Sequence, residues 1–150
     1  MSNASTLLRQ SAEKLQRSIG LVQASLGRTN AYDESRVYTA EELEPYDALA
    51  NRFERAVEVA QNKFFRAVEL FEGEPLSETV RDRLNRMEKL SFISDVELWM
   101  RMRDVRNRIS HDYLPGQVRQ IYDDIREAFA PELVMLAAKV SSYLSRIPID

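Results

Sequence analysis

The segment from Arg106 to Tyr113 carries the residues best suited to chemistry, and it includes the only histidine of the chain. Arg106 is a permanent cation, Asn107 offers an amide, His111 titrates near neutral pH and Tyr113 carries a phenol. Together these groups could break or remake a phosphodiester, because an acid–base group and a cation are the parts that this reaction needs. The alternative is that His111 is an ordinary hydrogen-bonded residue near a helix end.

Other catalytic chemistries have little support in the sequence. The chain has no cysteine and one histidine, which makes a zinc centre or a carboxylate-bridged metal pair improbable and removes thiolate catalysis. It contains no glycine-rich phosphate loop, dinucleotide fingerprint or serine-hydrolase elbow. We therefore expect no metal and no cofactor, which leaves acid–base chemistry centred on His111.

Arginines gather around this segment although the whole chain is slightly acidic. The formal net charge is −3, which argues against a protein that coats nucleic acid nonspecifically. Arg101, Arg103 and Arg108 nevertheless lie close to Arg106, and a guanidinium suits bidentate contact with phosphate. We predict that these arginines contact phosphate, and the alternative is a solvated helix face.

The length of 150 residues fits one domain, 1–150, in which residues 1–4 could be a tag or disordered. Hydrophobic residues make up 44% and charged residues 30% of the chain, as in a folded globular protein. No apolar stretch approaches the roughly 18 residues of a membrane span, and the beginning of the chain does not resemble a secretory signal. We expect a cytoplasmic protein without a membrane partner.

The spacing of apolar residues predicts helices throughout. Residues 5–27 have one apolar seam, 28–38 form a polar linker, and a second helix runs from a Thr39–Glu42 capping box to Phe71. A short helix spans 80–90, and a Ser94–Glu97 capping box precedes a fourth helix. Pro115 and Gly116 end that helix, and the last begins near Gln117 with a kink at Pro131. The expected fold is all-α: an antiparallel up-and-down four-helix bundle with one short extra helix.

The apolar stripe of the fourth helix is expected to consist of Leu98, Met102, Val105 and Ile109. Trp99, Met100 and Tyr113 flank this stripe. They either widen the face that packs on the core or mark a surface shared with a second copy of the chain.

The segment resembles the HEPN superfamily, whose members carry an arginine, a polar residue, three variable residues and a histidine late in a helical bundle. Arg106, Asn107 and His111 match this motif, and Tyr113 completes the form typical of HepT-like toxins. The resemblance implies a homodimeric, metal-independent endoribonuclease with His111 as acid–base and Arg106 as transition-state stabiliser. Under this interpretation Arg101, Arg103 and Arg108 would contact the RNA. It also implies a minimal nucleotidyltransferase as antitoxin, encoded beside the toxin, which adenylylates Tyr113.

A sister group with the same bundle provides the alternative: a noncatalytic substrate-binding subunit of a nucleotidyltransferase. The run from Asp47 to Ala56 resembles that group at least as closely. Geometry also constrains the ribonuclease, because positions 106 and 111 lie about 140° apart around an ideal helix. The two side chains would converge only at a helix end or across a dimer, so we predict a composite site on a twofold axis.

Overall fold

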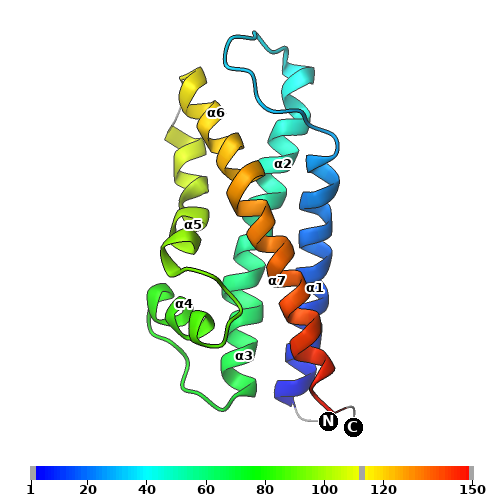
Figure 1. The fold of residues 1–150 in the computed structure, drawn as a ribbon, viewed down its shortest axis with the longest axis vertical. Coiled ribbons are helices and arrows are strands. Elements are labelled where there is room, and N and C mark those ends of the chain that lie inside the picture. Colours follow the sequence, from blue (N-terminus) through cyan, green and yellow to red (C-terminus); the bar gives the residue numbers. More distant parts are fainter. Residues whose placement is uncertain (1–2, 112–113, 149–150) are drawn as a thin grey trace.

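The computed structural model describes residues 3–111 and 114–148, and the side chain of His111 is also outside the description. Within these residues the protein is helical and contains no strand, which confirms the all-α fold class (Figure 1). None of the described helices is both long enough and apolar enough to cross a bilayer.

The long helical rods are packed side by side, and each runs antiparallel to the one before it in the sequence (Figure 1). The first is α1 (Asn3–Leu26), and the second joins α2 (Ala40–Val59), the π-helical turn η1 (Ala60–Phe64) and α3 (Phe65–Phe71). The third is α5 (Val96–His111), and the fourth joins α6 (Pro115–Asp124), the π-helical turn η2 (Ile125–Phe129) and α7 (Ala130–Ser145). The short extra helix is α4 (Val80–Lys89), which packs beside α3 and α5.

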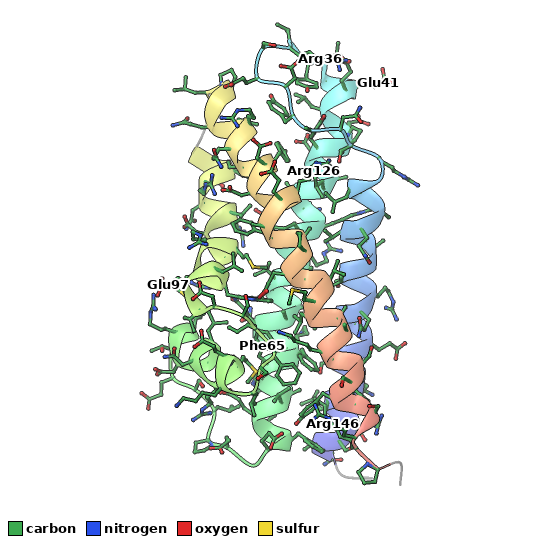
Figure 2. The ribbon with its side chains drawn as sticks, in the orientation of Figure 1. Arg36, Glu41, Phe65, Glu97, Arg126 and Arg146 are labelled. Carbon is green, nitrogen blue, oxygen red and sulfur yellow. The ribbon has the colours of Figure 1, made fainter. Side chains whose placement is uncertain are left out.

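The core lies where the apolar seams of the four rods meet, and it forms one continuous cluster. The predicted seam of α1 is confirmed, since Leu8, Leu15 and Ile19 are each at most 1% exposed. Phe65 points from α3 into the interior of the bundle (Figure 2). The predicted stripe of α5 needs one correction: Trp99 is completely buried and Leu98 is only partly buried. Trp99 therefore widens the face of α5 that packs on the core.

One of the two predicted capping boxes is confirmed and the other is wrong. At the start of α2, Thr39 and Glu42 each accept a hydrogen bond from the other's backbone N–H. At the start of α5, Asp95 is the cap, because its carboxylate accepts from the Leu98 N–H at 2.9 Å. Ser94 instead donates from its backbone and hydroxyl to Glu132 of α7.

The prolines act differently from the sequence-based expectation. Pro115 begins α6, because a proline at the first helical position loses no hydrogen bond there. The irregularity expected at Pro131 is the π-helical turn η2 just before it, in which the Ala130 N–H reaches back to the Ile125 carbonyl. The second π-helical turn, η1, contains no proline and was not anticipated.

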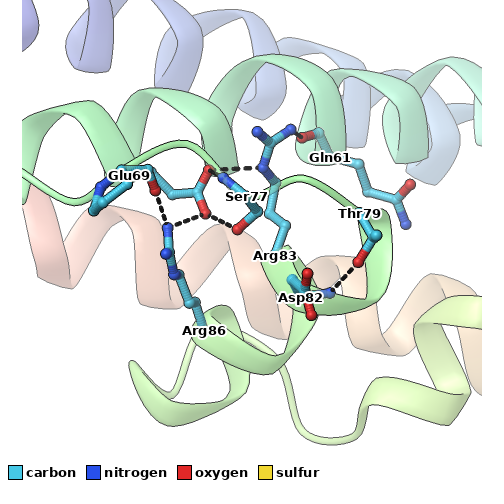
Figure 3. A network of polar contacts seen from close by, with 8 residues as sticks. Gln61, Glu69, Ser77, Thr79, Asp82, Arg83 and Arg86 are labelled. Atoms are coloured by element: carbon cyan, nitrogen blue, oxygen red, sulfur yellow. Dashed lines mark hydrogen bonds and ion pairs between the residues drawn. The ribbon is translucent and has the colours of Figure 1, made fainter.

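A buried carboxylate joins α4 to α3 (Figure 3). Glu69 of α3 is 1% exposed and accepts hydrogen bonds from Arg83 Nε at 2.9 Å and from an Arg86 guanidinium nitrogen at 2.8 Å. The backbone and hydroxyl of Ser77 also donate to it. These contacts hold α4 and the preceding loop in place beside the second rod.

Candidate functional site

The last two turns of α5 carry the predicted site residues. Arg106 and Asn107 are both exposed, and the Asn107 amide donates to Asp104 Oδ1 at 3.1 Å. His111 is the final residue of α5, so positions 106 and 111 belong to one continuous helix and lie about 140° apart around its axis. Tyr113 lies outside the described residues. The predicted meeting of Arg106 with His111 stays a prediction.

Arg108 has a different environment from its neighbours. Its guanidinium lies 2.8 Å from Asp124 Oδ2 of α6, and both side chains are about three-quarters buried. This ion pair holds the end of α5 against α6. Arg108 is therefore already paired within the bundle, whereas Arg101, Arg103 and Arg106 are exposed.

A groove of about 820 Å³ lies between α5 and the second rod. The α5 side contributes Arg101, Arg103 and Arg106 together with Asn107 and the half-buried Met100. The opposite side and floor come from α2 and η1, and the groove is lined there by Asn51, Glu54, Arg55, Val57, Glu58, Gln61 and Asn62. Grooves of this volume are in the range that holds a small ligand.

The rim of the groove carries both signs of charge. Arg55, Arg101, Arg103 and Arg106 face the same space as Glu54, Glu58 and Asp104. In the part of the chain that the structure describes, the side chains of these four arginines form no hydrogen bond and no close ion pair. Their hydrogen-bonding capacity is therefore free for a bound group, and guanidinium groups suit phosphate or carboxylate.

Glu54 is the ionisable group of the groove whose acidity the fold changes. Burial raises the pKa of this carboxyl above its usual range, although the charge of Arg106 acts in the opposite direction. Desolvation therefore outweighs the attraction between the two residues. Burying the charged carboxylate costs folding free energy, and this cost disappears when the carboxyl is protonated.

Replacing Glu54 with glutamine is expected to raise the thermal midpoint slightly at neutral pH. Because the folded pKa is raised, the folded state is penalised where Glu54 is charged, and the penalty disappears as pH falls through that pKa. The gain should therefore vanish near and below the ordinary glutamate pKa of about 4.3. Differential scanning calorimetry across this range measures it, with Glu58→Gln as an exposed control in the same groove. A lower midpoint for Glu54→Gln at neutral pH would contradict the argument.

Several groove residues were not singled out from the sequence. Asn51, Glu54 and Arg55 belong to the run from Asp47 to Ala56 that resembles the substrate-binding sister group, so a signal existed for them. Gln61 gave no signal: it is 4% exposed and lies in the π-helical turn η1. A π-helical turn changes which residues face a neighbouring helix, and such turns are frequent at functional sites.

These features define an all-α helical-bundle protein with an arginine-lined groove between two of its rods. A family model described as nucleotidyltransferase substrate binding protein like matches residues 3–142. The chain belongs to this family. A comparison with curated proteins finds no match.

Proposed function

We propose that this protein is a noncatalytic subunit that binds a substrate for a partner nucleotidyltransferase, and that the groove between α2 and α5 holds the substrate. The observation that carries the proposal is the family match over residues 3–142. The groove supports it, because both of its sides contribute arginines whose side chains form no hydrogen bond or close ion pair with the described residues. An acceptor bearing phosphate or carboxylate would supply hydrogen-bond acceptors for these guanidinium groups.

The charge pattern favours a small substrate over a long polyanion. Affinity for nucleic acid grows with the number of phosphates that cations neutralise. Here Glu54, Glu58 and Asp104 interrupt the arginines of the groove, and the formal net charge of the chain is −3. A long phosphate backbone would meet these carboxylates, whereas one or two anionic groups can contact the arginines alone.

The proposal is tested by co-expressing the chain with a nucleotidyltransferase encoded beside it and measuring complex formation and transfer of a labelled nucleotide to a small acceptor. We expect a stable complex, and we expect the variant Arg103→Gln/Arg106→Gln to lower transfer at least tenfold, since a charged hydrogen bond contributes about 1.5–3 kcal/mol. Arg17→Gln is the control, because Arg17 is 69% exposed on α1 and outside the groove. Absence of a complex, or equal transfer by both variants, would contradict the proposal.

A second candidate is favoured by the motif Arg106, Asn107 and His111: the homodimeric, metal-independent endoribonuclease of a HepT-like toxin–antitoxin pair. In that reaction His111 would take the proton of a 2′-hydroxyl, and the oxygen would attack phosphorus while Arg106 stabilised the phosphorane. The bond to the 5′-oxygen would break, protonated His111 would return the proton to that oxygen, and a 2′,3′-cyclic phosphate would remain. The nucleotidyltransferase would then be the antitoxin and Tyr113 its adenylylation site.

The same purified protein separates the two candidates. The ribonuclease predicts RNA cleavage in EDTA that His111→Ala abolishes, whereas the substrate-binding subunit predicts no cleavage by either protein. Loss of labelling by the partner in a Tyr113→Phe variant, without any RNA cleavage, would favour a noncatalytic subunit that presents its own Tyr113. The same loss together with cleavage would favour the toxin.

A further inference from the structure

The amide of Gln61 is the unusual polar group of the groove. Gln61 is 4% exposed, and its Nε2 atom has no hydrogen-bond partner among the residues that the structure describes. Its backbone carbonyl, in contrast, accepts from an Arg83 guanidinium nitrogen at 3.3 Å. Figure 3 shows the Gln61 side chain extending away from the contacts around Glu69. A buried donor without an acceptor costs about 1–3 kcal/mol, so this side chain is destabilising unless something accepts its hydrogen bond.

Gln61 lines the same groove as the free arginines. Val57 and Met102 are buried there and the half-buried Met100 lies beside them, so this part of the groove has apolar walls. A flat aromatic ring fits such walls, and thioether sulfur makes favourable contacts with aromatic rings. An acceptor atom on the edge of that ring would satisfy the Gln61 amide.

Arg106 lies further along the groove than Gln61. Glu54 and Arg106 line the groove from opposite sides, the charge of Arg106 lowers the pKa of the Glu54 carboxyl, and Gln61 follows Glu54 by seven residues on the same rod. At 1.5 Å per helical residue, Gln61 and the Arg106 end are separated by about 10 Å. The Gln61 part of the groove thus presents an amide donor and apolar side chains, with Arg101 beside them, whereas Arg103 and Arg106 follow along α5 toward Glu54. This separation suits the base and the phosphate of one nucleotide.

We propose that the groove binds a single nucleotide, with Gln61 Nε2 donating a hydrogen bond to a carbonyl oxygen or ring nitrogen of the base and with Arg103 and Arg106 contacting the phosphate. The inference rests on the proposed function, and it gives the chemical class of the substrate. Gln61 would be the residue that reads the base. The shielding of Nε2 implies that lining side chains such as Met100 shift when the nucleotide enters, which an unbranched side chain permits.

Isothermal titration of the purified chain tests the proposal, with AMP, GMP, CMP, UMP, ribose 5-phosphate and inorganic phosphate as separate probes. We expect at least one nucleotide to bind and to bind more tightly than ribose 5-phosphate or phosphate. The Gln61→Met variant keeps the side-chain length and removes the donor, and it should weaken that nucleotide about tenfold. Its thermal midpoint should be unchanged or higher, because it removes a buried donor that is unpaired in the free protein.

Gln23→Met is the matched control, because Gln23 is exposed on α1 and outside the groove. It should leave nucleotide affinity unchanged, and Arg103→Gln should weaken every phosphorylated probe alike. The proposal is overturned if no nucleotide binds, if phosphate alone binds as tightly, or if Gln61→Met keeps the original affinity. These outcomes leave complex formation with the nucleotidyltransferase untouched, so failure of this inference is distinguishable from failure of the proposed function.

Discussion

Replacing Glu69 with glutamine is expected to lower the free energy of unfolding by about 3 kcal/mol, the cost typical of removing one partner from a buried ion pair. Glutamine keeps the volume of the side chain but loses the negative charge that Arg83 and Arg86 contact at 2.9 and 2.8 Å. The Arg83 side chain is only 16% exposed, so water cannot replace the lost carboxylate well. Urea unfolding followed by circular dichroism measures the change.

The same carboxylate should make stability depend on pH. Burial of Glu69 opposes ionisation, but hydrogen bonds from Ser77 and Arg83 outweigh it and hold the pKa below its ordinary value. Since the folded pKa is lowered, the contribution of Glu69 is fully present above the unfolded pKa and is lost as pH falls through the folded one. The difference between wild type and Glu69→Gln should therefore shrink on acidification.

The exposed Glu13 provides the control for this measurement. Glu13 is 76% exposed on α1 and pairs with Arg17 one turn away, so Glu13→Gln should change the free energy of unfolding by at most about 0.5 kcal/mol. If Glu69→Gln changed the free energy of unfolding as little as Glu13→Gln, the inference that Glu69 anchors α4 through Arg83 and Arg86 would be wrong. If amide hydrogen exchange in Glu69→Gln became faster in α4 alone, the substitution would have loosened only this helix and not the whole bundle.

Most helices could be predicted from the sequence because their packing faces repeat with the period of the helix. The α1 seam is regular, and the Thr39–Glu42 pair lies within one turn, so both are local signals. The start of α5 was mispredicted because two capping residues, Ser94 and Asp95, stand side by side. The choice between them depends on Glu132, which follows Ser94 by 38 residues in sequence and accepts its hydroxyl hydrogen bond. No local pattern contains that partner.

The candidate site shows the same division between local and tertiary information. The arginines of α5 could be identified from the sequence. The sequence did not indicate which of them would form an ion pair within the bundle. Arg108 faces Asp124, whereas Arg106 faces the groove and Glu54, and this difference depends on how α5 is rotated between its neighbours. Gln61 could not be found, because it lies in the π-helical turn η1 and its burial depends on helices that are distant in the sequence.

Trp99 is expected to help set that rotation of α5. The indole is completely buried, its centroid lies 5.4 Å from that of Phe65, and its Nε1 donates to Glu132 of α7 at 2.9 Å. It therefore fixes the first turn of α5 to two other rods at once. Met102, one turn further along the same face, is buried and lines the groove.

The Trp99→Ala variant is expected to lose about 4 kcal/mol of unfolding free energy, in the range for removing a large buried aromatic side chain. Trp99→Phe keeps most of the packing against Phe65 and loses the indole donor, while Ser94 still donates to Glu132, so it should cost nearer 1 kcal/mol. Chemical unfolding of both variants gives these values. Similar losses for the two variants would mean that the hydrogen bond to Glu132, rather than the volume of the ring, holds α5. Trp99→Phe is expected to remain folded, so nucleotide titration of this variant tests whether the first turn of α5 sets the position of Arg103 and Arg106. A lower affinity is expected. An affinity equal to that of the unmodified chain would mean that the second rod and the Arg108–Asp124 pair position the groove instead.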